Sequence, residues 1–215
     1  ITLNAQMITI GNQNKEVLDL LNKTNNCFDG AVPLALYNLL VKFRYLNSRK
    51  YTKLSGSDII YKIFEEAKTQ NKKVFLLGSS DMKINRAIND VKEKHSLDIY
   101  GLPLPVVNER FDDAAIAKIL KNIESVRPDT ILIFLPFPKQ IYLSDRLSND
   151  LDKLGISSVI SLGGALDFFL EDISRAPRVI SCLGLESLYR FIQEPKFFRL
   201  QRILISLTFL RYIFR

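Results

Sequence analysis

Short apolar runs rich in β-branched and aromatic residues alternate along this chain with longer segments in which apolar residues recur at helical spacing. The clearest runs are residues 73–77, 130–135 and 157–162. Segments of helical period lie at residues 15–23, 33–46, 58–69, 83–94, 113–125 and 139–154. This alternation is typical of parallel strands joined by crossover helices. We therefore predict an α/β fold, a doubly wound and Rossmann-like parallel sheet flanked by helices.

Two helix starts carry a capping side chain in the sequence. Ser57 precedes the 58–69 segment, and Asp112 precedes the 113–125 segment. Side-chain oxygens of serine and aspartate accept hydrogen bonds from the unpaired amides of a first helical turn. We predict both residues as N-caps.

Length and cysteine usage limit the class of protein. A chain of 215 residues with 47% hydrophobic and 25% charged residues suits one globular α/β domain. Cys27 and Cys182, both in apolar surroundings, form neither a disulfide framework nor a cysteine metal site, so we expect a reducing, cytoplasmic compartment. No apolar stretch is long enough to span a bilayer. The chain begins with Ile rather than Met, so we expect a segment to precede it.

The net charge of +7 is concentrated at the C-terminal end. After Glu194 there are no acidic residues, whereas Lys196, Arg199, Arg202, Arg211 and Arg215 are basic. This distribution argues against nucleic-acid binding, which usually spreads basic residues over the folded domain.

We divide the chain into a core at residues 1–194 and a helical, membrane-associating appendage at 195–215. Its aromatic and aliphatic residues, with Arg199, Arg202 and Arg211, suit the headgroup layer of an anionic membrane at the cytoplasmic face. A final core helix or a dimer contact is the alternative.

In a doubly wound sheet, ligands bind beyond the carboxyl ends of the strands. The turn at Gly78 and the Gly163–Gly164 pair each follow a predicted strand, and their amides could hold a phosphate. Small residues are also needed there for the chain to turn. Asp29 could act as a partly desolvated general base, or Asp29–Gly30 could be a simple turn.

Several common chemistries are excluded by what the chain lacks. His95 is its only histidine and lies in a charged helix end, which removes serine–histidine, cysteine–histidine and histidine-based zinc catalysis. An Asp-x-Asp motif of the kind that holds Mg²⁺ on a nucleotide sugar is absent, and capping explains Asp112–Asp113. We expect no metal site and no cofactor.

The order of several motifs resembles that of the WecG/TagA/CpsF family of bacterial glycosyltransferases over essentially the whole chain. The resemblance is most specific in the C-terminal half and weaker upstream. The downstream motifs are 163–167, resembling Gly-Gly-x-Phe-Asp; 175–177, Arg-Ala-Pro; 184–190, resembling Gly-Leu-Glu-Trp-Leu-Tyr-Arg; and 194–195, Glu-Pro. The upstream motifs are 2–4, resembling Thr-x-Asn; 29–30, Asp-Gly; 56–58, Gly-x-Asp; and 138–140, Pro-x-Gln.

The resemblance implies an inverting, metal-independent transfer of a hexose or N-acetylhexosamine (N-acetylmannosamine, its uronic acid or glucose). The donor would be a UDP-sugar and the acceptor a polyprenyl-diphosphate-linked glycan. Such enzymes serve teichoic acid, capsule, exopolysaccharide or enterobacterial common antigen synthesis. A homo-oligomer is possible, and about one strand and one helix of the family's N-terminal region would be missing here.

The resemblance also assigns roles to residues. Asp29 would be the general base, with Thr2 beside it in the catalytic group. The diphosphate would be stabilised by the amides of Gly163 and Gly164 and by arginines, with Arg190 and the tail arginines as candidates. The predicted donor-binding residues are Asn4, Gly30, Gly78, Pro138, Gln140, Gly163, Gly164, Asp167, Arg175 and Arg190.

Four positions depart from the family pattern. Lys53 stands where the family usually has Arg, Pro136 where it has Gly, Ile141 where it has Glu, and Ser187 where it has Trp. These departures favour one alternative to the transferase, a catalytically weak nucleotide-binding homologue. The basic tail is compatible with the transferase and with a second alternative, a membrane-associated scaffold.

Overall fold

A computed structural model describes residues 1–43, 45, 50–104, 110–156, 158–174, 176–182 and 184–213, without the side chains of 178, 182 and 213. The chain forms two compact units, one of residues 1–55 and 173–215 and the other of residues 56–172. The division into a core and an appendage at residue 195 stays a prediction. The 195–215 segment groups with the N-terminal residues, and its membrane association stays a prediction.

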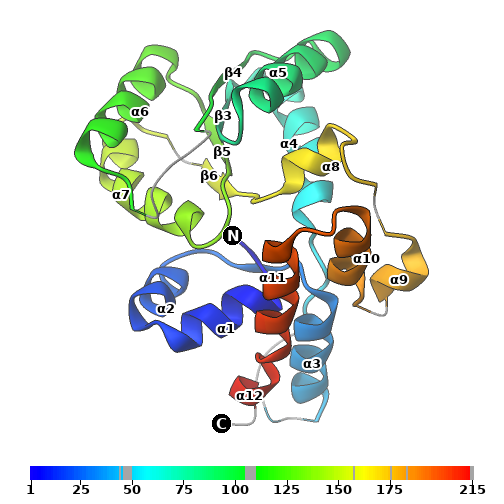
Figure 1. The fold of residues 1–215 in the computed structure, drawn as a ribbon. Helices are drawn as coiled ribbons and strands as arrows, with labels where there is room; N and C mark the ends of the chain where they lie inside the picture. Colours follow the sequence, from blue (N-terminus) through cyan, green and yellow to red (C-terminus); the bar gives the residue numbers. More distant parts are fainter. Residues whose placement is uncertain are drawn as a thin grey trace. The chain divides into compact units, whose positions relative to one another are not determined.

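The unit of residues 56–172 is a parallel α/β sheet (Figure 1). Its strands follow the order β4-β3-β5-β6, and every neighbouring pair is parallel. The strands are β3 (Val74–Gly78), β4 (Ile99–Leu102), β5 (Thr130–Phe134) and β6 (Ser158–Ser161). The helices are α4 (Gly56–Thr69), α5 (Asp81–His95), α6 (Asp113–Val126), α7 (Lys139–Lys153) and α8 (Ala165–Phe169).

Alternate residues of the central strands face opposite layers of helices. Val74 and Leu76 of β3 belong to a buried cluster with residues of α4, α5 and α8. Phe75 and Leu77 belong to a second cluster with residues of α6 and α7. Because successive side chains of a strand point to opposite faces, both faces of this sheet are covered (Figure 1). The predicted Rossmann-like α/β class is confirmed.

The unit of residues 1–55 and 173–215 is largely helical around a two-stranded parallel sheet. Its strands are β1 (Thr2–Leu3) and β2 (Cys27–Phe28). Its helices are α1 (Ala5–Gln13), α2 (Lys15–Asn22), α3 (Ala31–Lys42), α9 (Arg178–Cys182), α10 (Glu186–Gln193), α11 (Phe197–Leu207) and α12 (Leu210–Ile213). Helix α11 packs along α1 (Figure 1). The C-terminal segment is helical, as predicted.

One of the two predicted caps is confirmed and the other is wrong. Asp112 accepts a hydrogen bond from the amide of Ala115 at 2.7 Å and caps α6. Helix α4, however, begins at Gly56, so Ser57 already lies inside the helix. Helix α3 also begins earlier than the predicted 33–46 segment and ends at Lys42. Residues 44 and 46 of that prediction lie outside the described residues.

Candidate functional site

The N-terminal unit brings together the carboxyl ends of its two strands. Thr2 pairs with Cys27 and Leu3 with Phe28 in parallel register. The amides of Asp29 and Gly30 both donate to the Leu3 carbonyl, at 2.8 and 3.3 Å. The pairing thus places Asp29 directly beside the end of β1. Thr2 is buried in this pair, and Asp29 is half-buried.

Two of the predicted donor residues begin helices at these strand ends. Oδ1 of Asn4 accepts from the Met7 amide at 3.1 Å and caps α1. Gly30 occupies the cap position of α3. A Cβ at Gly30 would lie 3.1 Å from Cδ of Pro33 and 3.5 Å from Cα of Asn4. The structure therefore collects Thr2, Asn4, Asp29 and Gly30, and it gives Asn4 and Gly30 structural roles beside their predicted ones.

The Cys27 thiol lies within the electrostatic reach of Asp29. Burial is the largest cause that raises the pKa of Cys27, and the negative charge of Asp29 raises it further. A carboxylate disfavours a second negative charge close to it. Removal of the Asp29 charge should therefore lower the pKa of the Cys27 thiol.

The motif at 184–190 also lies in this unit and packs against the helix that follows Asp29. Gly184 has φ +74°, and a Cβ there would lie 2.4 Å from Cγ2 of Val32 in the first turn of α3. Oε1 of Glu186 accepts hydrogen bonds from the Lys53 ammonium group and from the Ser181 hydroxyl, each at 2.5 Å. Lys53 stands where the family usually has Arg, so this departure still places a positive charge next to the Glu186 carboxylate.

The second group of predicted residues lies at the carboxyl ends of β5 and β6. Gln140, in the first turn of α7, is fully buried. Its Oε1 lies 3.7 Å from the position that a Cβ at Gly163 would take. Neither Oε1 nor Nε2 of Gln140 has a hydrogen-bond partner among the described residues. A buried amide without partners costs free energy, so Gln140 is an unsatisfied polar side chain in this part of the structure, and its role in donor binding stays a prediction.

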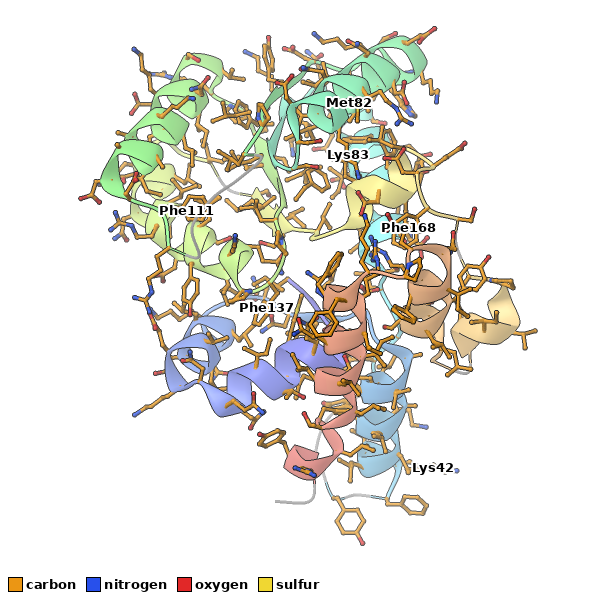
Figure 2. The ribbon with its side chains drawn as sticks, viewed as in Figure 1. Lys42, Met82, Lys83, Phe111, Phe137 and Phe168 are labelled. Atoms are coloured by element: carbon orange, nitrogen blue, oxygen red, sulfur yellow. The ribbon has the colours of Figure 1, made fainter. Side chains whose placement is uncertain are left out.

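The backbone around Gln140 is anchored to the end of β6. The Gln140 carbonyl accepts the Ser144 hydroxyl at 2.9 Å, and that hydroxyl lies 3.3 Å from the hydroxyl of Ser161. Pro138, which follows a cis Phe137–Pro138 peptide bond, occupies the cap position of α7. Figure 2 labels Phe137 in this turn. The turn therefore fixes where the Gln140 side chain starts.

The glycines at the strand ends are required for different reasons, one steric and one conformational. Gly78 has φ +109°, and a Cβ there would lie 2.9 Å from the Phe134 carbonyl oxygen, so close packing on β5 explains it. Gly163 has φ +56°, but its Cβ would meet only ordinary contacts, at 3.7 Å or more. Its conformation rather than lack of space therefore favours glycine. Gly164 follows as the cap residue of α8.

Asp167, the last residue of the 163–167 motif, lies on α8 and is held by a residue that the sequence did not single out. Nζ of Lys83 on α5 lies 2.6 Å from Oδ1 of Asp167. The two residues are 84 positions apart, and neither belongs to a pattern that would have paired them. The sequence signal was only the basic residue in the first turn after Gly78-Ser79-Ser80.

The predicted arginines lie in different surroundings. Arg190 is half-buried on α10, Arg202 is half-buried on α11, and Arg211 is exposed on α12. Arg199 is buried and pairs with Glu194 of the Glu-Pro motif. This contact gives Arg199 a structural role, and its binding to a phosphate stays a prediction. Arg175 lies outside the described residues.

The described residues hold neither a cluster of metal-binding side chains nor a membrane-spanning helix. In that part of the chain, no three His, Cys, Asp or Glu side chains gather as a group that could hold a metal ion. Nor does it contain a helix with the length and apolar character needed to cross a bilayer.

Comparison with known proteins identifies the family to which this chain belongs. The model of the glycosyl transferase WecG/TagA/CpsF family matches residues 1–215. The chain is also similar to an N-acetylglucosaminyldiphosphoundecaprenol N-acetyl-beta-D-mannosaminyltransferase of Bacillus subtilis (strain 168). The two are 23% identical over 196 residues, which cover 90% of this chain and 71% of the relative. The chain belongs to the WecG/TagA/CpsF family and is a glycosyltransferase that serves cell-surface polysaccharide synthesis.

Proposed function

We propose that this enzyme transfers an N-acetylmannosamine-type sugar from UDP to a polyprenyl-diphosphate-linked N-acetylglucosamine. The name of the Bacillus subtilis relative supports both the sugar and the acceptor. The family assignment supports the reaction class. The enzyme would act as a peripheral protein at the cytoplasmic face of the membrane, where such an acceptor is anchored.

The observation that carries the donor proposal is the buried Gln140 amide. Its Oε1 and Nε2 have no partner among the described residues, and Gly163 faces Oε1. Ligands of parallel α/β sheets bind beyond the carboxyl ends of the strands, which is where this amide lies. A UDP-sugar offers donors and acceptors that would satisfy both amide atoms. Gly163, Gly164 and Asp167 would complete the donor contacts.

Asp29 would act as the general base. Its carboxylate would take the proton of the acceptor hydroxyl while that oxygen bonds to the anomeric carbon of the sugar. The bond from the anomeric carbon to the diphosphate would break, and UDP would leave with the electron pair. A single displacement inverts the anomeric centre, so an α-linked donor would give the β product. Arginine, with Arg190 as first candidate, would offset the charge on UDP.

Binding of UDP tests the role of Gln140 directly. Gln140→Leu keeps the volume and removes both polar atoms, so we expect the Kd of UDP to rise about tenfold or more, since a ligand loses one or two buried hydrogen bonds. Ser148→Ala on the exposed side of α7 is the matched control. Calorimetric titration with UDP measures both. Unchanged affinity in Gln140→Leu would remove Gln140 from the donor site.

The metal-independent mechanism is tested separately. We expect transfer to continue after EDTA treatment followed by gel filtration. Loss of transfer that Mg²⁺ or Mn²⁺ restores would show a metal-dependent enzyme instead. A chain that binds UDP but transfers no sugar would support the catalytically weak homologue, and one that binds membranes but no UDP would support the scaffold.

A further inference from the structure

Helix α5 holds the segment that carries Asp167 through three ionic contacts. Lys83 lies 2.6 Å from Oδ1 of Asp167 and 3.5 Å from Oδ2 of Asp172. One turn further along α5, Arg86 donates to Oδ1 of Asp172 at 2.8 Å and to the Leu170 carbonyl at 2.6 Å. Lys83 thus contacts the start of α8, and Arg86 contacts the residues just after its end.

Helix α8 needs such contacts because it has only five residues. A helix this short is not stable on its own. On its apolar side, Phe169 packs against Tyr61 and Phe64 of α4, with ring centroids 5.5 and 5.4 Å apart. That packing fixes the C-terminal turn of α8. In the first turn of α8, Ala165 and Leu166 are buried in the core, and the Asp167 carboxylate pairs with Lys83.

The start of α5 is itself well defined. Ser80 caps the helix, and its hydroxyl oxygen accepts from the Lys83 amide at 3.4 Å. This cap sets the direction in which the Lys83 side chain leaves the helix. Figure 2 labels Lys83 on α5 and Phe168 on α8, next to Asp167. The Lys83 side chain is 29% exposed and that of Asp167 is 21% exposed, so water screens the pair only in part.

We propose that Lys83 is a positioning residue for donor binding, because it holds the Asp167 carboxylate and, through it, the Gly163–Gly164 turn that precedes α8. This inference rests on the proposed function, in which Asp167 and this turn contact the UDP-sugar. Lys83 acts through Asp167 and makes no contact with the donor in this account. Without Lys83, the Asp167 carboxylate would lose this ion pair beside the Gly163–Gly164 turn, and donor affinity would fall.

Arg86 provides the matched control. It lies on the same helix, belongs to the same ionic cluster and contacts Asp172 and the Leu170 carbonyl. Lys83→Met and Arg86→Met each remove one cation from α5. A merely structural role of the cluster predicts the same effect from both. A positioning role predicts an effect on the donor from Lys83→Met alone.

The experiment compares the full chain with Lys83→Met, Lys83→Arg and Arg86→Met. The readouts are the Kd of UDP, the KM of the UDP-sugar, kcat and the midpoint of urea unfolding. For Lys83→Met we expect Kd and KM to rise about tenfold, with kcat at saturating donor changed less than about threefold, because orientation rather than chemistry is lost. Lys83→Arg should recover most of the affinity. Arg86→Met should bind UDP within about twofold of the unsubstituted chain at a similar unfolding midpoint.

Two results would overturn the inference. One is a Lys83→Met chain that binds UDP as the unsubstituted chain does. The other is an equal loss of affinity in Arg86→Met, which would make the cluster structural. Failure of the proposed function is distinguishable, since the unsubstituted chain would then bind no UDP, and the positioning role would fall with it. If Lys83→Met does not fold, Lys83→Gln and Lys83→Arg provide the same comparison.

Discussion

The ammonium group of Lys53 and the carboxylate of Glu186 are in direct contact, with Nζ 2.5 Å from Oε1. Lys53 is a position where the family usually has Arg, and Glu186 belongs to the 184–190 motif. Lys53 therefore keeps the positive charge that pairs with the Glu186 carboxylate. The side chains are 29% and 41% exposed, so the pair belongs to the class of weak, partly solvated ion pairs.

For Lys53→Met we expect the free energy of unfolding to fall by at most about 1 kcal/mol, as for partly exposed pairs. Lys53→Arg should keep the pair and stay within about 0.5 kcal/mol of the original. Urea unfolding at low and high salt measures both. A Lys53→Met chain that is several kcal/mol less stable would mean that the pair is far less screened than its exposure indicates.

Gly184 should not tolerate a side chain. Gly184→Ala combines a positive φ of +74° with a Cβ 2.4 Å from Cγ2 of Val32. We expect a loss of about 2 to 4 kcal/mol, from backbone strain of about 1 kcal/mol and from overpacking. Adding Val32→Ala should recover the overpacking part but not the strain. Thermal unfolding of the two single variants and the double variant measures the coupling, and purely additive effects would contradict the contact.

The Cys27 thiol offers a test of the Asp29 charge. Because the Asp29 carboxylate raises the pKa of Cys27, in addition to the larger effect of burial, Asp29→Asn should lower that pKa. More thiolate would then be present at pH 8, and alkylation of Cys27 by iodoacetamide should be faster by severalfold. Peptide mass spectrometry resolves Cys27 from Cys182. Asp19→Asn, on α2, is the control. An unchanged alkylation rate of Cys27 in Asp29→Asn would show that the Asp29 carboxylate does not act on the thiol.

Helix α11 presents an apolar stripe that suits a membrane surface. Leu200, Leu204 and Leu207 are all exposed and lie on one face of the helix. We expect Leu204→Ser with Leu207→Ser to weaken binding to phosphatidylglycerol vesicles at least tenfold, because inserted leucines each contribute roughly 1.5 to 3 kcal/mol. Met82→Ser, an exposed apolar residue on α5 (Figure 2), is the control.

Substitution is a cleaner test of the tail than deletion. Helix α11 packs along α1, so removal of residues 195–215 would also uncover α1. Vesicle flotation at low and high salt separates the apolar contribution from that of Arg202 and Arg211. Equal flotation of the doubly substituted chain and the original would exclude this stripe as the membrane contact.

Strands β3 and β5 and helices α4 to α7 of the α/β unit were predictable because their patterns are strong. The runs at 73–77 and 130–135 are apolar on both faces, as buried parallel strands require, and the structure has β3 and β5 there. Helix α1 was missed because residues 2–4 resemble a strand end, and only the Asn4 cap shows that a helix follows at once. Strand β4 was missed because it is short and contains Gly101.

The candidate site was predictable only in its motif residues. The resemblance supplied Asp29, Gln140 and Asp167, but sequence cannot show that the Gln140 amide is buried without a described partner. Nor can it show the contact of Lys83 with Asp167, because 84 residues separate them and either charge could have faced solvent. Long-range ion pairs depend on how helices pack, which local patterns do not encode.

Sugar transfer by the original chain and by Asp29→Asn is the decisive measurement for the proposed reaction. The substrates are UDP-N-acetylmannosamine and a polyprenyl-diphosphate-linked N-acetylglucosamine in detergent or vesicles, and the readout is the disaccharide lipid together with released UDP. We predict acceptor-dependent product from the original chain, and from Asp29→Asn a kcat lower by about 10²- to 10⁴-fold with a nearly unchanged Kd for UDP. Unchanged kcat in Asp29→Asn, or no product from the original chain with this donor and acceptor, would contradict the account.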